Sequence, residues 1–283
     1  MKNYLSLVKF SHTVFALPFA VIGFFIAVKL HHYQFNPKIF ILVIICMIAA
    51  RNAAMAFNRY LDREIDKKNP RTAVREIPSG KISSSQALIF TIINALVFIS
   101  STFFLNRLVF FLSPVALAVI LGYSYTKRFT PLCHLILGLG LSLAPVGAYL
   151  AVTAKFHVLP VLLGFSVLFW VSGFDIIYAL QDESFDKANN LYSIPAALGK
   201  VKALRLSRIL HGISFIFLLT AGHVGNFSYY YYIGVAIFGI MLVYQHTLVK
   251  PDDLRKVNLA FFTTNGVSSV VFAIFVLLDL FVS

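Results

Sequence analysis

The sequence predicts an all-α polytopic membrane protein, a bundle of about nine transmembrane helices. Hydrophobic residues make up 59% of its 283 residues and charged residues only 12%, whereas soluble domains hold about 45–50% and about 25%. An uncharged run over residues 209–249 is long enough to cross a hydrocarbon core of about 30 Å twice. These features exclude a freely diffusing cytosolic enzyme and a secreted soluble domain.

Charges, prolines and clusters of Asn and Gly divide the chain into hydrophobic segments of spanning length. The expected helices lie near 10–28, 39–57, 86–105, 108–126, 131–153, 158–178, 205–222, 229–249 and 258–280. The first is too long for the core of a signal peptide and lacks an A-x-A-like cleavage site, so we expect it to be retained. Short breaks at 106–107 and 222–226 predict tight hairpins. We therefore expect a single transmembrane domain over residues 1–283.

The distribution of basic residues predicts the orientation of the helices. With the N-terminus inside, all but four of the 24 Lys and Arg residues lie on the inner side; the exceptions are Lys29, Lys38, Arg107 and Lys155. Basic residues accumulate in cytoplasmic loops, so an odd number of helices gives a cytoplasmic N-terminus and an external C-terminus. The net charge of +13 is thus explained by topology, and we expect no nucleic-acid partner.

Two short cytoplasmic loops, residues 58–81 and 175–202, hold eight of the eleven acidic residues. In the first loop, Asn58, Asp62 and Asp66 are spaced by four residues, so a continuing helix places them on one face as a column of oxygen ligands. Arg51 lies seven residues before Asn58, on the same side and deeper in the membrane. An unpaired guanidinium is expensive there, so Arg51 needs an anion or a path to water, which it would also reach by snorkelling to the interface.

The second loop repeats this arrangement. Asp175, Tyr178, Asp182 and Asp186 follow one another at helical spacing and form another stripe. Two facing stripes of carboxylates repel each other unless divalent cations lie between them. Oxygen donors of this kind suit Mg²⁺, which binds through one or two carboxylates together with substrate phosphates. The stripes therefore indicate a Mg²⁺ site that binds a diphosphate, although either stripe alone is also typical of a solvated loop.

Basic residues surround both stripes. They are Lys67, Lys68, Arg71, Arg75 and Lys81 after the first stripe, and Lys127 and Arg128 at the end of the segment 108–126. Cations beside a cluster of carboxylates and metal ions can neutralise phosphate oxygens and stabilise a departing diphosphate.

Two other functions fit a polytopic protein with acidic residues. A transporter carries its acids near the middle of the membrane, whereas these acids lie at the cytoplasmic ends of helices. A membrane phosphotransferase that acts on nucleotide-activated alcohols also uses Asp-rich helices and a metal, but its D-G-x-x-A-R spacing is absent from this sequence. The position of the acids therefore favours an enzyme of another kind.

At these residues the sequence resembles the UbiA superfamily of intramembrane prenyltransferases. Residues 51–66 match the first Asp-rich motif of that family, N-x-x-x-D-x-x-x-D, and residues 69–80 match the stretch that follows it. Residues 175–186 match the second motif, D-x-x-Y-x-x-x-D-x-x-x-D, and residues 123–128 resemble the family's aromatic-then-Lys-Arg signature. The resemblance covers essentially the whole chain, because the nine expected helices also agree.

The resemblance implies a helical bundle around a central cavity that opens sideways to lipid. It implies a Mg²⁺-dependent enzyme of quinone biosynthesis in the bacterial plasma membrane, which transfers a polyprenyl group from polyprenyl diphosphate to a small aromatic acceptor. The implied metal ligands are Asn58, Asp62, Asp66, Asp182 and Asp186. The implied diphosphate contacts are Asn58, Arg71, Lys127 and Arg128, and Asp175 and Tyr178 would orient the acceptor or receive its proton.

One position departs from the pattern of many family members. Those that prenylate 4-hydroxybenzoate often have Asp directly after the Asn of the first motif, and here that position is Arg59. The opening segment 9–19 and the Phe-Asn-Arg form resemble a 4-hydroxybenzoate polyprenyltransferase-like branch, some of whose members serve a menaquinone route. The acceptor stays open between 4-hydroxybenzoate and a naphthoate, with haem or chlorophyll prenylation as a further alternative.

Overall fold

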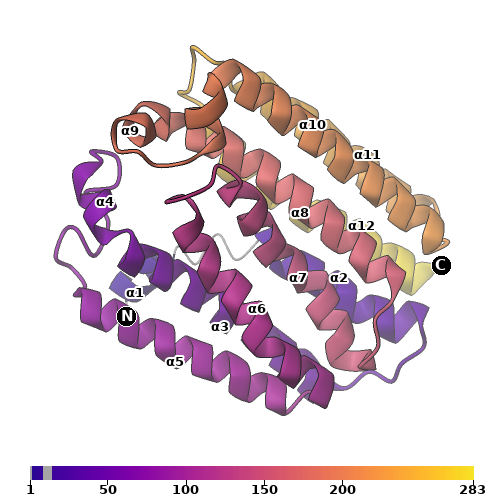
Figure 1. The fold of residues 1–283 in the computed structure, drawn as a ribbon. Helices are drawn as coiled ribbons and strands as arrows, with labels where there is room; N and C mark the ends of the chain where they lie inside the picture. Colours follow the sequence, from indigo (N-terminus) through magenta and orange to yellow (C-terminus); the bar gives the residue numbers. More distant parts are fainter. Residues whose placement is uncertain (1, 9–14) are drawn as a thin grey trace.

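The computed structural model describes residues 2–8 and 15–283, and these residues form helices joined by short connections, without a β-strand among them (Figure 1). Eight described segments are long and apolar enough to cross a membrane. They contain α3 (Pro37–Leu61), α5 (Ser84–Phe103), α6 (Arg107–Thr126), α7 (Cys133–Thr153), α8 (Val158–Ala179), α10 (Ile194–Val224), α11 (Tyr229–Leu248) and α12 (Asn265–Val282). A shorter apolar helix, α2 (Leu17–Phe25), continues as a π-helical turn, Ile26–Leu30. The predicted all-α membrane fold is confirmed.

Short helices gather at one end of the bundle. Helices α1 (Lys2–Leu7), α4 (Arg63–Lys68) and α9 (Glu183–Ala188) lie there, whereas the C-terminus lies at the other end (Figure 1). Helix α4 follows α3 directly, and a 3₁₀ turn, Leu180–Asp182, links α8 to α9. We call this the acidic end, because both Asp-rich motifs finish in it.

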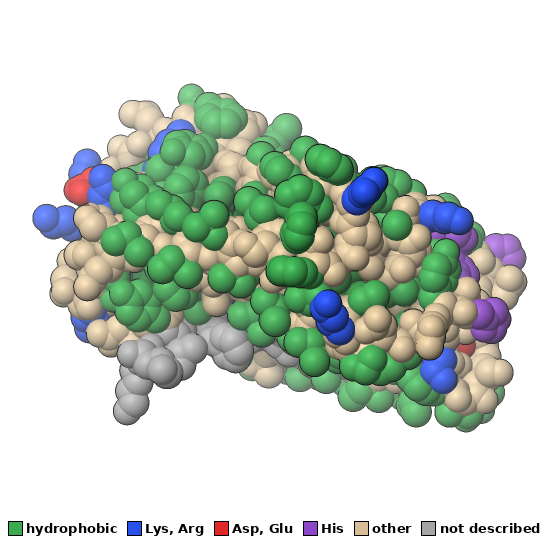
Figure 2. Space-filling view, turned by 90° about the horizontal axis from the view of Figure 1, so that it is seen from below, with side chains coloured by type: hydrophobic (Ala, Val, Ile, Leu, Met, Phe, Trp, Pro, Cys, Tyr) green, Lys and Arg blue, Asp and Glu red, His purple; other side chains and the backbone are tan. Residues whose placement is uncertain are grey.

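Hydrophobic side chains cover much of the length of the face shown in Figure 2, as a lipid-facing surface requires. The interior is apolar and aromatic as well. Trp170 on α8 is fully buried, and its indole N–H donates to Oδ1 of Asn265 on α12 at 3.0 Å. Phe19 and Phe174 pack their rings against it. Since lipid is as apolar as this core, close packing and such hydrogen bonds hold the helices together.

Helix α8 packs against both α7 and α10, and small residues permit the close approach. A Cβ atom at Gly138 of α7 would lie 2.4 Å from the carbonyl oxygen of Leu168 on α8. A Cβ atom at Gly173 of α8 would lie 2.3 Å from the imidazole ring of His211 on α10. No side chain fits at either place, so these glycines fix α7, α8 and α10 relative to one another.

The helix boundaries differ from the predicted ones where charged residues continue a helix. The segment expected at 205–222 starts earlier. Ser193 caps a short helical stretch that begins at Ile194, the backbone leaves the helical conformation at Gly199 (φ 76°), and the long helix continues from there to Val224. The segment expected at 39–57 continues to Leu61, because its polar residues face the protein interior and not lipid. Of the segment expected at 10–28, residues 10–14 lie outside the described part, and α2 begins at Leu17.

Candidate active site

A cavity of about 1280 Å³ lies inside the bundle. Its walls come mainly from α3, α6, α7 and α8, with the π-helical turn Leu259–Thr264 closing one side. On α3 its lining runs from Val43 to Asp62, a distance of about 28 Å at the helical rise of about 1.5 Å per residue. The wall is apolar along most of this length and charged at the acidic end. A molecule with a long apolar tail and an anionic head group matches that division.

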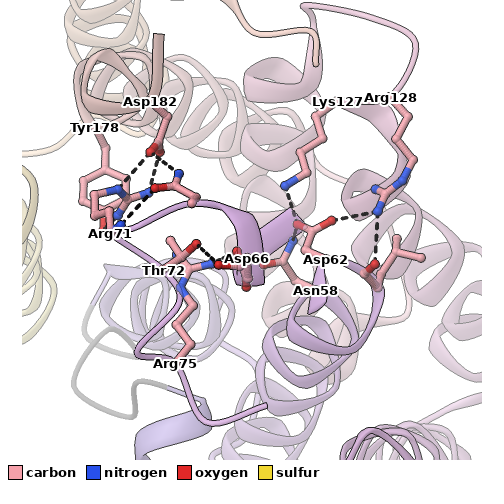
Figure 3. A network of polar contacts seen from close by, with 12 residues as sticks. Asn58, Asp62, Asp66, Arg71, Thr72, Arg75, Lys127, Arg128, Tyr178 and Asp182 are labelled. Carbon is pink, nitrogen blue, oxygen red and sulfur yellow. Dashed lines mark hydrogen bonds and ion pairs between the residues drawn. The ribbon is translucent and has the colours of Figure 1, made fainter. Parts of the chain in front are cut away.

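The first Asp-rich motif supplies part of the charged head of the cavity. Asn58 lies in the last turn of α3, and Asp62 occupies the junction between α3 and α4. The Asn58 amide donates to Asp62 Oδ2 at 3.1 Å, and Lys127 Nζ lies 2.5 Å from the same oxygen. Arg128 Nη2 donates to Asp62 Oδ1 at 2.9 Å (Figure 3). Although Asp62 is only 1% exposed, two cations compensate its charge.

Asp66 in α4 has one paired and one unpaired carboxylate oxygen. Arg75 Nη1 donates to Oδ1 at 2.7 Å, and Asp66 itself is 3% exposed. Its Oδ2 atom is buried without a hydrogen-bond partner among the described residues. The Thr72 hydroxyl donates to the Asp66 carbonyl oxygen at 3.0 Å and fixes the turn after α4 (Figure 3). A buried acceptor without a donor is costly, so Asp66 has the chemistry of a ligand for a cation.

The loop after α4 reaches across to the second motif. Arg71 Nε donates to Asp182 Oδ1 at 2.9 Å, and its Nη2 atom also contacts Asp182 Oδ2. The Asn69 amide donates to Asp182 Oδ1 at 3.0 Å. Burial alone would lower the pKa of Arg71, but its hydrogen bond and ion pair with Asp182 outweigh that effect and raise the pKa. The two motifs are therefore joined by an arginine and an amide, and not directly by their carboxylates.

Tyr178 and Asp186 occupy different sides of the second motif. The Tyr178 hydroxyl accepts from Arg71 Nη1 at 3.0 Å, and its ring lies 4.2 Å from the ring of Phe261, centroid to centroid. Asp186 Oδ2 accepts from the Ser193 hydroxyl at 2.8 Å. Both residues line the cavity, as do all the other residues that the sequence proposes for the site except Arg128, which reaches it through Asp62.

The carboxylates of the two motifs are separated by cations. Among the described residues there is no group of three His, Cys, Asp or Glu side chains close enough to hold a metal ion. Each of Asp62, Asp66 and Asp182 is instead paired with Lys or Arg. The predicted stripes thus share one cavity, and basic residues occupy the space between them.

Sequence reasoning missed one residue of this region, His134. It lies in the first turn of α7, is 3% exposed, and its Nδ1 atom lies 2.7 Å from Asp175 Oδ2. The only signal in the sequence is a polar residue just inside a spanning segment. No spacing rule relates two positions that are 41 residues apart.

Two arginines of α3 line the cavity from the first motif inward. Arg51 donates from Nη1 to the Val8 carbonyl oxygen at 2.7 Å, so this guanidinium has the partner that its depth requires. Arg59 is 6% exposed, and its Nε atom has no hydrogen-bond partner among the described residues. The wall of the cavity next to the first motif is therefore cationic.

Comparison with known proteins identifies the fold and the family. The model of the UbiA prenyltransferase family matches residues 16–267. A 4-hydroxybenzoate octaprenyltransferase of Francisella tularensis subsp. mediasiatica (strain FSC147) is 29% identical over 243 residues, 85% of each chain. One of Coxiella burnetii (strain CbuK_Q154) is 27% identical over 238 residues, 83% of this chain and 82% of the relative.

Solved structures agree over almost the whole chain. A UbiA homolog from Aeropyrum pernix K1 superposes with a TM-score of 0.85 at 29% identity, over 95% of this chain and 98% of that one. A UbiA homolog from Archaeoglobus fulgidus bound to GPP and Mg²⁺ has the same fold, with a TM-score of 0.74 at 18% identity over 98% and 99% of the two chains. The predicted family and enzyme class are confirmed: this chain belongs to the UbiA prenyltransferase family.

Proposed function

We propose that this protein transfers a polyprenyl group from polyprenyl diphosphate to a small aromatic acceptor, with Mg²⁺ required. One observation carries the proposal. A single cavity of about 1280 Å³ joins an apolar body that traverses most of a membrane to a head lined by carboxylates, lysine and arginine. This is larger than the range of about 300–1,000 Å³ that is usual for sites of drug-sized ligands.

The residues of the head fit a divalent cation. Carboxylate and amide oxygens are the donors that Mg²⁺ prefers, and Asp66 Oδ2 is a buried oxygen that needs a partner. We assign Asn58, Asp62, Asp66, Asp182 and Asp186 to Mg²⁺. The bound metal would neutralise diphosphate oxygens and favour departure of the diphosphate.

The basic residues of the head would bind the diphosphate. Lys127, Arg128 and Arg71 now pair with carboxylates, and each can turn to a phosphate oxygen once a cation compensates its carboxylate. Their positive charge stabilises the negative charge that develops when the allylic C–O bond breaks and its electron pair stays on the diphosphate. Before the diphosphate binds, the ion pairs hold these basic side chains in place.

The acceptor would attack from the side of Asp175 and Tyr178. A ring carbon of the acceptor forms a bond to the allylic carbon, and the proton on that ring carbon then leaves to Asp175. Phe174 and Phe261 line the cavity beside these residues and exclude water, which would otherwise capture the allylic cation. Each transfer therefore releases one diphosphate and one proton.

The relatives support 4-hydroxybenzoate as the acceptor, because both are named for octaprenyl transfer to it. A naphthoate with a similar carboxylate is the second candidate. The cationic wall formed by Arg51 and Arg59 suits a carboxylate on either ring system. We further propose that the acidic end faces the cytoplasm, because the positive-inside bias favours it.

The test is a prenyl-transfer assay with purified protein in detergent. Octaprenyl diphosphate and Mg²⁺ are incubated with 4-hydroxybenzoate or a dihydroxynaphthoate, and product is measured by mass spectrometry. We expect product with one acceptor, and its loss with EDTA, Asp62→Asn or Asp182→Asn. Asp253→Asn is the matched control, because Asp253 pairs with exposed Arg255 away from the cavity. No product with either acceptor, or full activity of Asp62→Asn, contradicts the proposal.

A further inference from the structure

His134 forms a buried contact with the residue proposed to receive the acceptor's proton. Its Nδ1 atom lies 2.7 Å from Asp175 Oδ2, and the side chain of His134 is 4% exposed against 23% for Asp175. The other carboxylate oxygen, Oδ1, makes no hydrogen bond to a described residue, and Asp175 lines the cavity. One oxygen of Asp175 is thus held by His134, and the other is available to a substrate.

The first turn of α10 determines which nitrogen of His134 carries the proton. The first amide groups of a helix lack partners within it, and the Ser193 hydroxyl satisfies one of them by accepting from the Ala196 N–H at 3.3 Å. Pro195 has no N–H group. The N–H of Ile194 needs a partner outside the helix, and it donates to His134 Nε2 at 3.3 Å. Because Nε2 accepts, its lone pair is in use and the proton of the neutral imidazole is on Nδ1.

This arrangement makes His134 a donor to Asp175. Nδ1–H donates to Asp175 Oδ2 and stabilises the carboxylate form. His134 cannot accept a proton at Nε2 without breaking its bond to Ile194, so it does not relay the proton further. Asp175 Oδ1 is therefore the atom that receives the proton from the acceptor's ring.

The segment that leads into α10 also contacts the diphosphate side of the site. In residues 192–194, which we call the linking segment, the Tyr192 N–H donates to the Lys127 carbonyl oxygen at 2.7 Å. The Ser193 hydroxyl donates to Asp186 Oδ2 at 2.8 Å, and the next residue, Ile194, holds His134. The linking segment therefore connects a residue assigned to the metal with the residue assigned to the acceptor.

We propose that His134 is a positioning residue with two separable contacts. Its Nδ1–H aligns Asp175 for proton removal from the aromatic acceptor, and its Nε2 holds the linking segment, and with it Asp186, in place for the diphosphate. This inference rests on the proposed function.

Two conservative substitutions separate the two contacts. In His134→Gln the terminal amide oxygen occupies the place of Nε2, so the contact with Ile194 is kept and the donor to Asp175 is lost. In His134→Asn the amide nitrogen occupies the place of Nδ1, so the donor to Asp175 is kept and the contact with Ile194 is lost. The two variants are each other's matched control for changes in folding.

Steady-state kinetics with each substrate varied in turn gives the test. For His134→Gln we expect kcat to fall by about 10- to 100-fold, as is typical for groups that orient a functional side chain, with KM for the prenyl diphosphate unchanged. For His134→Asn we expect kcat to be largely retained and KM for the prenyl diphosphate to rise. Equal losses in both variants would show that His134 is only structural, and wild-type kinetics of His134→Gln would also overturn the inference.

A second measurement does not need turnover. Protein labelled with ¹⁵N in the imidazole rings of its eight histidines reports which ring nitrogen carries the proton. We expect an Nδ1–H signal that disappears in either His134 variant. An Nε2–H tautomer for His134 overturns the inference whatever the activity. An inactive wild type in the prenyl-transfer assay refutes the proposed function, and the tautomer of His134 can still be measured in that case.

Discussion

Gly147 offers a way to shorten the cavity without disturbing the helix. It lies on α7, thirteen residues after His134 and thus about 20 Å below the charged head at about 1.5 Å per residue. It lines the cavity, and a Cβ atom added to it would meet nothing within 4 Å. In Gly147→Phe the ring would therefore occupy space that the far part of a long prenyl tail needs.

The size of the effect follows from the surroundings of the tail. Moving a prenyl tail from lipid to an apolar cavity gains little hydrophobic free energy, so the loss is one of steric fit. Overpacking of an apolar interior costs about 1–3 kcal/mol, which corresponds to about 5- to 150-fold in kcat/KM. We expect that loss with octaprenyl diphosphate and less than about a twofold change with geranyl diphosphate, whose tail ends before Gly147.

The assay compares kcat/KM for the two diphosphates in one preparation. Gly212→Phe on α10 is the matched control, because Gly212 is exposed, has no neighbour within 4 Å of an added Cβ and does not line the cavity. The control should leave the ratio of the two kcat/KM values unchanged. An equal loss of both values in Gly147→Phe, or no loss of either, would show that the ring at this position does not limit the length of the tail.

Three further predictions concern the ion pair of Arg71, the buried carboxylate of Asp279 and the orientation of the protein in the membrane. Arg71→Lys should lower kcat/KM by about ten- to a hundredfold in the prenyl-transfer assay, because an ammonium cannot make the forked contact with Asp182; unchanged kinetics would contradict this. Asp279→Ala should lower the Tm in detergent without changing kcat, because the N–H of Tyr231 and the Ser228 hydroxyl lose their buried acceptor at a cost of about 1–3 kcal/mol. Without the native cysteines, an impermeant maleimide should label Lys155→Cys on intact cells and Lys68→Cys only after permeabilisation, and the reverse pattern would invert the orientation.

Spacing along a single helix was readable from the sequence. The first motif follows one helical path, although α3 ends and α4 begins at Asp62. The Asp62 N–H donates to the Asn58 carbonyl oxygen, and the Asp66 N–H donates to the Asp62 carbonyl oxygen. Hydrophobic length likewise placed the spanning helices, since every backbone group inside a membrane must be paired within its own segment. Local rules are sufficient for features of this kind.

Contacts between distant segments were not readable in the same way. Spacing placed each acidic stripe on one helical face, but it did not show that Arg71 and Asn69, in the loop after the first motif, contact Asp182 of the second. The contact between His134 and Asp175 depends on the close approach of α7 and α8 at Gly138. Such pairings follow from helix packing, which no periodicity within one segment specifies.

The ion pairs of Asp62 couple the binding of the metal to the binding of the diphosphate. A divalent cation at Asp62 competes with Lys127 and Arg128, which lie 2.5 and 2.9 Å from its oxygens. Those two side chains are more than half buried, so they need another anion once the carboxylate is taken. A diphosphate supplies oxygens to both, which makes the binding of metal and diphosphate reciprocal.

We therefore expect Mg²⁺ to bind at least about fivefold more tightly in the presence of a thiolodiphosphate analogue of the prenyl substrate, within the coupling of about 1–3 kcal/mol that is usual between linked sites. Calorimetric titration of Mg²⁺ with and without the analogue measures the difference. In Lys127→Met the competing ammonium is gone, so Mg²⁺ alone should bind more tightly than to the wild type and the coupling should shrink. Equal Mg²⁺ affinity in both titrations of the wild type would mean that these cations do not exchange one anion for the other.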